Sequence, residues 1–510
     1  MSRRPGRGFV WQSPPALHPF AFTRRFRAWH LVLGALFVYT VVCVWSAFRG
    51  GVFAFHDLGL LNDLFSNAVH RGRPFWVTDG DFNHLTVHFT PTLLLLTPLF
   101  LLSDSQFLFI LLGLVALYAA VALQVWFFER MVEEKELLPA AWRPWASVAF
   151  TLYLALNPFV KTVALSAHFE VFFQLGSTAV LVMLLRGTRM RWVVPVALLA
   201  LGVRPDGGLF LAFQSAALLL LPAVARPPRA LLTRRALGVS ALAFGYLALC
   251  VAVVLPALGT PSGTRFWSHY GSTWGQVAFT ALGDPGRVVH DVTTSGLVVF
   301  QRSFWWLQLL SPAATLVSTI PGTFFFMADA PDKRLLWFYN SAFLLPGLGV
   351  CAAAGFGRLA EVWKGVLARG RVPAWTATVP ALLLAVLAIL QVARFDRTIG
   401  SPPLRPMPAV DGDFREAFAR QVQTCASWRA VATDFRSIVF VPNGYDRFLL
   451  HHYERAQVVL VPPRVDTLLL GAESREALLD TLQGDSRFEE VADPGPVRVF
   501  VRKDARGCGS

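Results

Sequence analysis

Two long stretches of the chain contain no charged residue, and they constrain the fold more than any other feature. HLVLGALFVYTVVCVWSAF covers residues 30–48, and SQFLFILLGLVALYAAVALQVWFF covers residues 105–128. An α-helix needs about 20 apolar residues to cross the hydrocarbon core of a bilayer. Within lipid every backbone amide must be satisfied inside its own segment, so both stretches must be helical. The sequence therefore predicts a polytopic helical membrane protein.

The distribution of charge agrees with this class. Only 15% of the 510 residues are charged, whereas a soluble domain carries about a quarter. The net charge is +14, but from residue 394 onward 16 Lys and Arg balance 16 Asp and Glu, so the excess precedes residue 394. Basic clusters beside apolar segments are typical of cytoplasmic loops. The chain has no basic groove interleaved with aromatic residues, which argues against nucleic acid as a partner. The clusters are Arg3, Arg4, Arg7, Arg24, Arg25 and Arg27; Arg186, Arg189 and Arg191; Arg226, Arg229, Arg234 and Arg235; and Arg358, Lys364, Arg369 and Arg371.

Placing these clusters in the cytoplasm determines the path of the chain by parity. Residues 1–29 form a basic cytoplasmic N-terminus, and residues 30–393 form an all-α transmembrane domain with about eleven crossings. The loops 49–104 and 257–300 lie on the outer face, and the tail 394–510 is extracytoplasmic. The predicted location is the plasma (inner) membrane of a bacterium.

The tail has the composition of a small α/β unit. Apolar, β-prone runs occur at 437–442, 456–463 and 497–503, and helical patterns occur at 414–425 and 473–485. Neither a glycine-rich phosphate loop nor an HExxH or GxSxG motif is present.

Two features stay open. The mixed charge of residues 129–144 does not define their side of the membrane. Cys425 and Cys508 both lie in the tail, where they can form a disulfide if the tail is outside the cell. The five cysteines show no CxxC motif and no Cys/His metal spacing, so the sequence specifies no metal site.

The stretch FAFHDLGLLNDL, residues 53–64, places two acids directly after an apolar segment. Parity puts Asp57 and Asp63 on the outer face. Apolar residues recur at helical spacing from Leu60 to Ala68, which predicts an amphipathic helix along the membrane interface. Its polar residues are expected to face water: Asn62, Asp63, Asn67 and Arg71. Asp57 has two readings, as the N-cap of this helix or as a functional acid.

Other ionisable residues reach the same outer face. Ionisable groups at membrane depth usually face a cavity or a partner, so together these residues predict an outward-facing polar site at the membrane boundary. Each also has a plainer reading: the histidine pair as interfacial residues instead of metal ligands, Arg204 and Asp206 as a pair across a turn, and Lys333 and Arg334 as loop charges. The set is His84, His88, Lys161, His168, Glu170, Arg204, Asp206, Lys333 and Arg334.

Such a site has the groups that phosphate chemistry needs. Arg and Lys bind a lipid phosphate, Arg through bidentate contacts. A neighbouring carboxylate can deprotonate an incoming hydroxyl while the cations stabilise the phosphate leaving group.

Four stretches resemble a family of bacterial and archaeal membrane proteins, the domain of unknown function 2079, over most of residues 50–360. This family is in turn similar to the C-type glycosyltransferases, multi-helix enzymes that take a sugar from a polyprenyl-phosphate carrier at the outer face. The resemblance implies that Asp57 is the base and that Arg204 and Asp206 are functional. The sequence departs from the family at the hairpin tip, Arg-Pro-Asp in place of Lys-Glu-Asp-like residues, and at WFYN, where Tyr339 stands without the usual histidine. The four stretches are FHDLGLLNDLFSNAVHRG, HFTPTLLLLTPLF, RFWSHYGSTWGQVAFTALGDPGRVV and IPGTFFFM…LLWFYNSAFLLPGL.

We therefore expect an inverting membrane glycosyltransferase with a lipid-linked sugar donor. Asp57 would be the general base and Arg204 the phosphate ligand; the other candidate substrate-binding or phosphate-binding residues are Asp206, Glu170, His168, His88, Arg265, Arg334 and Tyr339. A divalent cation held by Glu170 and Asp206 is the one cofactor considered. The sugar, carrier lipid and acceptor stay open.

Two other functions are weighed. Pro- and Gly-interrupted helices at 193–224 and 303–327 are also a feature of transporters and flippases, and a non-catalytic scaffold is the third reading. An enzyme predicts that Asp57, Glu170 and Arg204 line one cleft, whereas a transporter predicts a cavity at the bilayer midplane.

Overall fold

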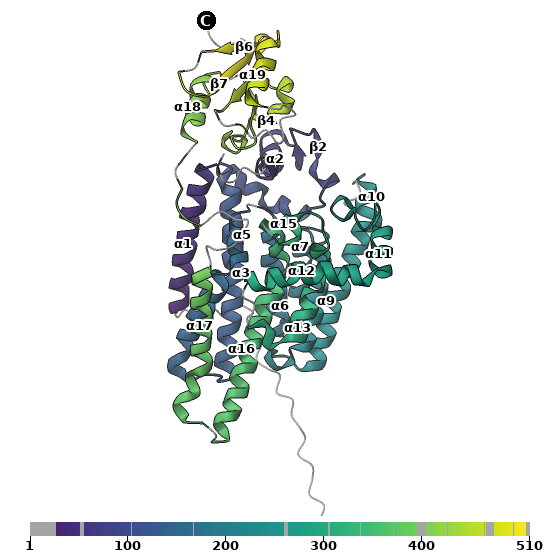
Figure 1. Ribbon diagram of the computed structural model, residues 1–510, viewed down its shortest axis with the longest axis vertical. Helices are drawn as coiled ribbons and strands as arrows, with labels where there is room; N and C mark the ends of the chain where they lie inside the picture. The colour runs from purple at the N-terminus through teal and green to yellow at the C-terminus, as the bar shows by residue number, and fades with distance from the viewer. Residues whose placement is uncertain are drawn as a thin grey trace, which may run out of the picture.

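The computed structural model is mostly helical, with a small sheet near the C-terminus (Figure 1). The residues that it describes are 27–51, 56–103, 105–166, 168–259, 264–303, 307–336, 338–370, 372–394, 404–407, 409, 411–425, 427–463, 465, 474–492 and 494–505.

The helices follow the apolar segments of the sequence, and the short strands lie between residues 76 and 83 and in the tail. The helices are α1 (Ala28–Arg49), α2 (His56–Arg71), α3 (Phe107–Glu134), α4 (Arg143–Ala155), α5 (Pro158–Ala164), α6 (Glu170–Leu185), α7 (Met190–Leu201), α8 (Gly207–Ala217), α9 (Arg229–Leu249), α10 (Leu255–Ala257), α11 (Trp274–Gly283), α12 (Pro285–Ser303), α13 (Pro312–Thr319), α14 (Thr323–Phe326), α15 (Pro331–Arg334), α16 (Leu345–Ala368), α17 (Val379–Arg394), α18 (Gly412–Gln421) and α19 (Arg475–Gly484). The strands are β1 (Trp76–Val77), β2 (Phe82–Asn83), β3 (Ala430–Thr433), β4 (Asp446–Leu449), β5 (Val458–Val461), β6 (Phe488–Val491) and β7 (Arg498–Arg502), and the 3-10 helices used below are η2 (Pro91–Leu101), η10 (Phe338–Phe343), η13 (Ile438–Phe440) and η14 (Leu450–Arg455).

Four helices in the described part of the chain are long and apolar enough to cross a membrane: Ala28–Arg49, Phe107–Glu134, Arg229–Ala257 and Trp375–Arg394. A fifth candidate, Ala140–Ala155 with Pro158–Ala164, is bent by 57°. Asn157 lies at the bend, where its side chain caps the second segment before Pro158. Because other apolar helices are shorter, among them Glu170–Leu185 and Met190–Leu201, the predicted count of about eleven crossings stays a prediction.

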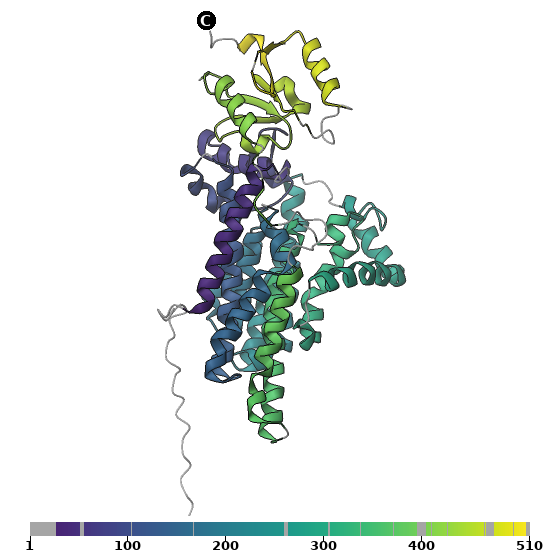
Figure 2. The ribbon, with the colours of Figure 1, turned by 60° about the vertical axis from the view of Figure 1, so that its left-hand side comes forward.

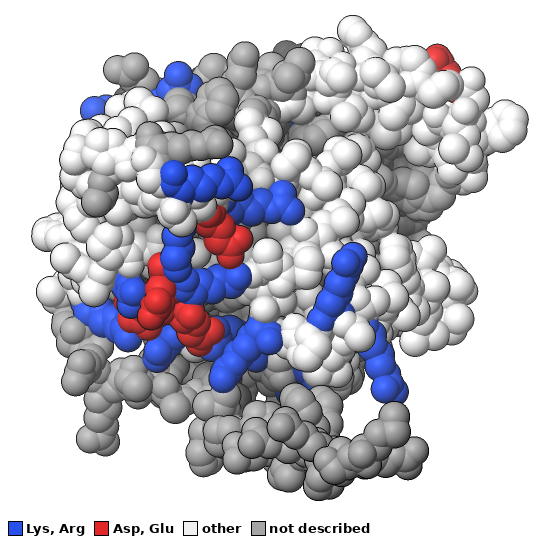
Figure 3. Space-filling model, turned by 90° about the horizontal axis from the view of Figure 1, so that it is seen from below, with Lys and Arg blue, Asp and Glu red and all other residues white. Residues whose placement is uncertain are grey.

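The lower end of the helix bundle carries many basic side chains, with a few acids between them (Figure 3). Ion pairs tie helix ends together here, between Arg186 and Glu134 at 2.6 Å and between Lys135 and Glu361 at 3.0 Å. The C-terminal sheet lies at the opposite end of the molecule (Figure 1). The basic side chains at the lower end are consistent with the predicted cytoplasmic clusters, and the assignment of sides stays a prediction.

The C-terminal sheet has five strands in the order β4-β3-β5-β7-β6. β3 pairs in parallel with β4 and β5, with Val431 opposite Val458, and β7 runs antiparallel to β5 and β6. All four residues of β5 are buried, as expected for a central strand covered on both faces. Helices α18 and α19 belong to the same end of the molecule (Figure 2). The predicted boundaries of the domains stay a prediction.

The apolar run at 437–442 is not a strand, contrary to the sequence prediction. It forms the 3-10 helix η13, and its residues are buried because they face the membrane helices. The Phe440 ring lies 5.5 Å from the Phe48 ring of α1. Gln106, at the start of α3, donates hydrogen bonds to the carbonyl oxygens of Ile438 and Val441. The hydrophobicity of this run reflects docking against the bundle, and not strand pairing.

The cysteines in the apolar segments, Cys43, Cys250 and Cys351, are free and buried, as expected for packing residues. Cys425 in the tail forms a disulfide. Cys508, its partner candidate from the sequence, lies outside the described residues.

Of the four polar residues of α2 that were expected to face water, Arg71 is exposed and the other three are not, which corrects the prediction for those three. Asn62, Asp63 and Asn67 are buried. The Asp63 carboxylate accepts a hydrogen bond from the Thr78 amide and pairs with Arg447 of β4, whose Nε lies 2.8 Å from Oδ1. Only 1% of each of these two residues is exposed. The helix is amphipathic as predicted, but its polar side is covered by the C-terminal sheet.

Further polar contacts extend this interface. Arg71 at the end of α2 pairs with Asp446. The Gly444 amide donates to Ser66 Oγ over 3.2 Å, and Asn62 donates to Asn443. The tail therefore packs on the first outer loop through matched polar groups.

Candidate active site

Arg204 lies at the turn between α7 and α8, and close packing holds this turn in place. A Cβ on Gly207 would come within 2.6 Å of the Phe173 ring of α6, and one on Gly208 within 2.8 Å of the Ala243 carbonyl oxygen of α9. The two glycines therefore allow α8 to lie against both neighbouring helices. On the opposite side of the turn, the Thr92 amide donates to the Gly202 carbonyl oxygen over 3.0 Å.

The Arg204 guanidinium joins two carboxylates. Its Nε donates to Asp206 Oδ1 over 2.8 Å, which confirms the pair across the turn, and its Nη1 donates to Glu170 Oε1. Glu170 is the first residue of α6, a position that favours a negative charge, and it is fully buried. The guanidinium also lies 5.6 Å from the Phe343 ring of η10. The Arg204 guanidinium is therefore held by two carboxylates, next to the aromatic ring of Phe343.

His168 and Tyr339 extend the cluster. His168 Nδ1 is hydrogen-bonded to Glu170 Oε2, and the imidazole stacks on the Tyr339 ring with centroids 3.9 Å apart. Lys333 of α15 places its ammonium 4.4 Å from the Phe266 ring and 6.0 Å from the Tyr339 ring. Four separate segments of the chain meet here.

His84 and His88 form another wall. Their ring centroids are 5.4 Å apart. Both rings lie edge-on to the Phe169 ring, with centroid distances of 6.0 Å for His84 and 5.9 Å for His88. Burial lowers the pKa of His88 well below its usual value, and the positive charge of Arg204 lowers it further. His88 is therefore a neutral imidazole beside the cationic part of the site.

The remaining predicted site residues lie apart from this cluster or cannot be placed. Arg334 directs its Nε to the Ala328 carbonyl oxygen at 2.9 Å. Asp57 belongs to the first turn of α2 and Arg265 to a 3-10 turn, and their side chains lie outside the described residues. The structure thus brings together His88, His168, Glu170, Arg204, Asp206 and Tyr339.

A second group of acids and a histidine lies beside the first. His269 Nδ1 is 2.6 Å from Asp329 Oδ1, and its Nε2 is 3.7 Å from Asp291 Oδ2. The Tyr270 hydroxyl donates to Asp291 over 2.8 Å. The group adjoins the first through Phe266, whose carbonyl oxygen accepts from the Asp329 amide. The sequence analysis singled out none of these residues; the available signal was His269 within the aromatic-rich stretch RFWSHYGSTW, directly before Tyr270.

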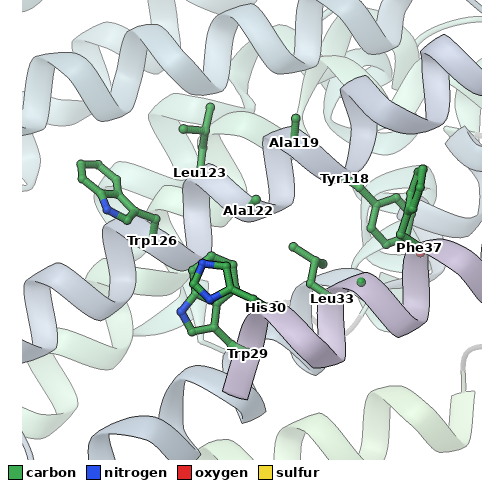
Figure 4. A pocket seen from close by; sticks show the side chains of 10 residues that line it. Trp29, His30, Leu33, Phe37, Tyr118, Ala119, Ala122, Leu123 and Trp126 are labelled. Atoms are coloured by element: carbon green, nitrogen blue, oxygen red, sulfur yellow. The ribbon is translucent and has the colours of Figure 1, made fainter. Parts of the chain in front are cut away.

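A groove elsewhere in the molecule lacks this chemistry. It has a volume of about 480 Å³ and is bordered by residues of α1 and α3, from Trp29 to Trp126 (Figure 4). Its lining is almost wholly apolar, and His30 and Tyr118 are the lining residues with ionisable side chains. The groove opens beside the start of α1, and no acid or arginine contributes to it, so we do not assign it a catalytic role.

The sequence profile of a family described as "Predicted membrane protein (DUF2079)" matches residues 40–415. The chain belongs to this family. The matched region of this DUF2079 protein includes His88, Glu170, Arg204 and Tyr339, so the clustered residues lie within the part that defines the family.

No curated protein matches the chain. Among solved structures, the chain is similar to the cryo-EM structure of the arabinofuranosyltransferase AftD from Mycobacteria, with 12% sequence identity and a TM-score of 0.42. The similarity covers 94% of this chain and 40% of that chain, so the DUF2079 protein spans less than half of the mycobacterial enzyme.

Proposed function

We propose that this DUF2079 protein is a membrane glycosyltransferase that takes a sugar from a lipid-linked phosphate donor at the Arg204 cluster. The observation that carries the proposal is the convergence of Arg204 and Asp206 from one turn with Glu170 of α6 and Lys333 of α15, beside aromatic rings. Structural packing alone does not require so many charges, because burying each of them has a desolvation cost.

Arg204 is the proposed phosphate ligand. Its Nε and Nη1 are held by Asp206 and Glu170, and its Nη2 makes no hydrogen bond to any residue that the structure describes. Two acids fix the guanidinium plane and leave one edge with donor capacity for a phosphate oxygen. Lys333 adds a second positive charge near the Tyr339 ring. A phosphate leaving group would gain stabilisation from both cations.

The general base is assigned to Asp57. Glu170 and Asp206 both engage Arg204, so each would lose part of its pairing on taking up a proton. Asp57 follows the first span and belongs to α2, a helix that packs on the outer loop containing His88 and Thr92. We propose that its carboxylate accepts the proton of the acceptor hydroxyl. No step in this scheme requires a metal.

A route for a lipid donor adjoins the cluster. Helices α11 and α12 project sideways from the bundle in both ribbon views (Figures 1 and 2). Phe279 and Leu282 of α11 are 80% and 82% exposed, which is unusual for large apolar side chains unless lipid or a partner covers them. Arg287 of α12 lies over the Tyr270 ring at 4.7 Å, on the side of the cluster that contains His269. This hairpin would hold the lipid chain while its phosphate reaches Arg204.

The outer position of the site is part of the proposal. The cluster lies toward the end of the bundle that bears the C-terminal sheet (Figure 1). The disulfide of Cys425 in that end supports an extracytoplasmic compartment, since disulfides persist in oxidising surroundings.

The test is sugar transfer by the purified full-length protein from radiolabelled polyprenyl-phosphate sugars. Wild type is expected to transfer label, whereas Asp57→Asn and Arg204→Ala are expected to lose transfer. Glu361→Gln is the matched control, because it removes an exposed acid at the opposite end of the bundle and should keep full transfer. Donor binding is measured in parallel: Arg204→Ala should weaken it and Asp57→Asn should keep it. Normal transfer by Asp57→Asn would refute the base, and absence of transfer from every donor by folded wild type would refute the enzyme.

A further inference from the structure

Asp79, His451 and His452 bring three ligating atoms within 4.8 Å of one another. Asp79 belongs to the turn between β1 and β2 in the first outer loop, and the two histidines belong to η14 in the C-terminal sheet region. We propose that these residues form a binding site for a divalent transition metal of the zinc class, which fastens the tail to the outer loop. The site does not depend on the function proposed above.

The Asp79 carboxylate is already positioned as a ligand. The residue is buried, and its Oδ1 accepts a hydrogen bond from the Leu449 amide over 2.8 Å. His452 Nδ1 lies 3.0 Å from the same oxygen. A backbone amide that orients a carboxylate is the kind of supporting contact that metal ligands usually have.

An irregular backbone brings the two histidine rings together. Successive side chains of a regular 3-10 helix point about 120° apart, so neighbouring histidines normally diverge. At His452 the backbone departs from helical values, with φ −115° and ψ 26°. The ring centroids of His451 and His452 are consequently 4.0 Å apart. The departure gives two adjacent residues a common direction, toward Asp79.

The donor set determines the class of metal. Two imidazole nitrogens and one carboxylate oxygen are suited to zinc and to similar first-row ions, and three protein ligands leave one position for water. Magnesium prefers oxygen ligands and is not expected here. Ligand atoms around a tetrahedral zinc lie about 3.3 Å apart, so the three groups must close by small side-chain rotations. His451, the most exposed of the three residues, would make the largest part of this adjustment.

One nearby cation opposes binding but is occupied elsewhere. Arg455 Nη1 donates to the Asp79 carbonyl oxygen over 2.8 Å, and its Nη2 lies 4.0 Å from Asp81 Oδ1. Its charge is directed to the backbone and to Asp81, and not to the Asp79 carboxylate. The metal would therefore add a second attachment between tail and loop, beside the Asp63–Arg447 pair.

The experiment uses full-length protein in detergent, stripped with a chelator and titrated with Zn²⁺ or Mg²⁺. Bound metal and the thermal unfolding midpoint are both measured. Wild type is expected to retain a stoichiometric amount of zinc and to unfold at a higher temperature with Zn²⁺, but not with Mg²⁺. His451→Ala is expected to lose at least about tenfold in zinc affinity, the scale on which metal sites respond to a lost contact.

The control is His290→Ala, which removes an exposed histidine of α12 far along the chain from the site and should bind zinc like wild type. His452→Ala also breaks the hydrogen bond to Asp79, so its failure to fold would leave His451→Ala to decide. Equal zinc binding and equal thermal shifts in wild type and His451→Ala would overturn the proposal, since the bound metal would then be adventitious.

Discussion

Arg447→Ala should release the C-terminal tail from the outer loop. The guanidinium is buried, with its Nε and Nη2 at 2.8 and 2.6 Å from Asp63 Oδ1. Its removal leaves the buried Asp63 carboxylate without its ion-pair partner, and with only the more distant charge of Arg71. The loss of one partner of such a pair typically costs about 3–5 kcal/mol.

The cost of removing Arg447 can also be estimated from the protonation of Asp63. Burial raises the pKa of the Asp63 carboxyl, and Arg447 is the main influence in the other direction. Without Arg447 the carboxyl can escape the penalty by taking up a proton. At pH 7, protonating an aspartate whose usual pKa is about 3.9 costs about 4 kcal/mol. The two estimates agree, and the second one predicts that the cost falls by about 1.4 kcal/mol for each pH unit of acidification.

Hydrogen exchange of the purified protein measures this effect. Amides of α2, β3 and β4 should exchange roughly a thousandfold faster in Arg447→Ala than in wild type at pH 7, the factor that corresponds to about 4 kcal/mol. The difference should shrink at pH 5. The double variant Asp63→Asn with Arg447→Met removes both charges and should recover most of the protection.

Arg71→Ala serves as the control within the same interface. The Arg71–Asp446 pair is partly exposed, and such pairs contribute at most about 1 kcal/mol. If Arg447→Ala costs no more than Arg71→Ala, or if its cost does not change with pH, the reasoning about an isolated buried carboxylate is wrong.

Three further predictions concern His88, the glycines of α16 and the Arg204 cluster. The pKa of His88 is lowered by burial and then by Arg204, His84, His168 and Lys333. Because the unfolded chain protonates this histidine near pH 6.5 and the folded chain does not, the stabilisation is complete above about pH 6.5 and falls below it. His88→Gln should therefore lessen the drop in thermal midpoint between pH 7.5 and 5.5. Gly355→Ala should lower the thermal midpoint by the equivalent of about 1–3 kcal/mol, because the new Cβ would overlap the Leu307 carbonyl oxygen. Gly365→Ala, on the same helix, places its Cβ in open space and should raise the thermal midpoint slightly. Arg204→Lys should reduce sugar transfer by about tenfold or more, because an ammonium cannot span Glu170 and Asp206 in the way that a guanidinium does; transfer equal to that of wild type would show that the fork geometry is unimportant.

The sequence predicted the class of the protein because the membrane imposes strict local rules. The uncharged stretches at 30–48 and 105–128 had to be helical, and they are, within α1 and α3. The helix over 56–71 was also predictable from its apolar spacing. The Arg204–Asp206 pair was also predictable, because the two residues are separated only by Pro205 within one turn. The contacts around Glu170 were harder to predict: His168 lies two residues away, but Arg204 reaches Glu170, and Tyr339 reaches His168, only through the packing of α6, α8 and η10.

The misassignments have a common cause. Asp63 appeared to face water, and residues 437–442 appeared to be a strand, because periodicity reports that a face is polar or apolar without showing what covers it. In the structure the polar face of α2 meets β4, and the apolar run meets α1 and α3.

The sequence by itself determined that this chain enters a membrane and where its long apolar helices lie. Those properties follow from lipid thickness and backbone hydrogen bonding, which act on each segment separately. Only the tertiary structure decided the partners: Arg204 with Glu170, Asp63 with Arg447, and Asp79 with His452. Two of these pairs join residues more than 350 positions apart, and because such contacts arise from the way helices and sheet pack, no local pattern in the chain encodes them.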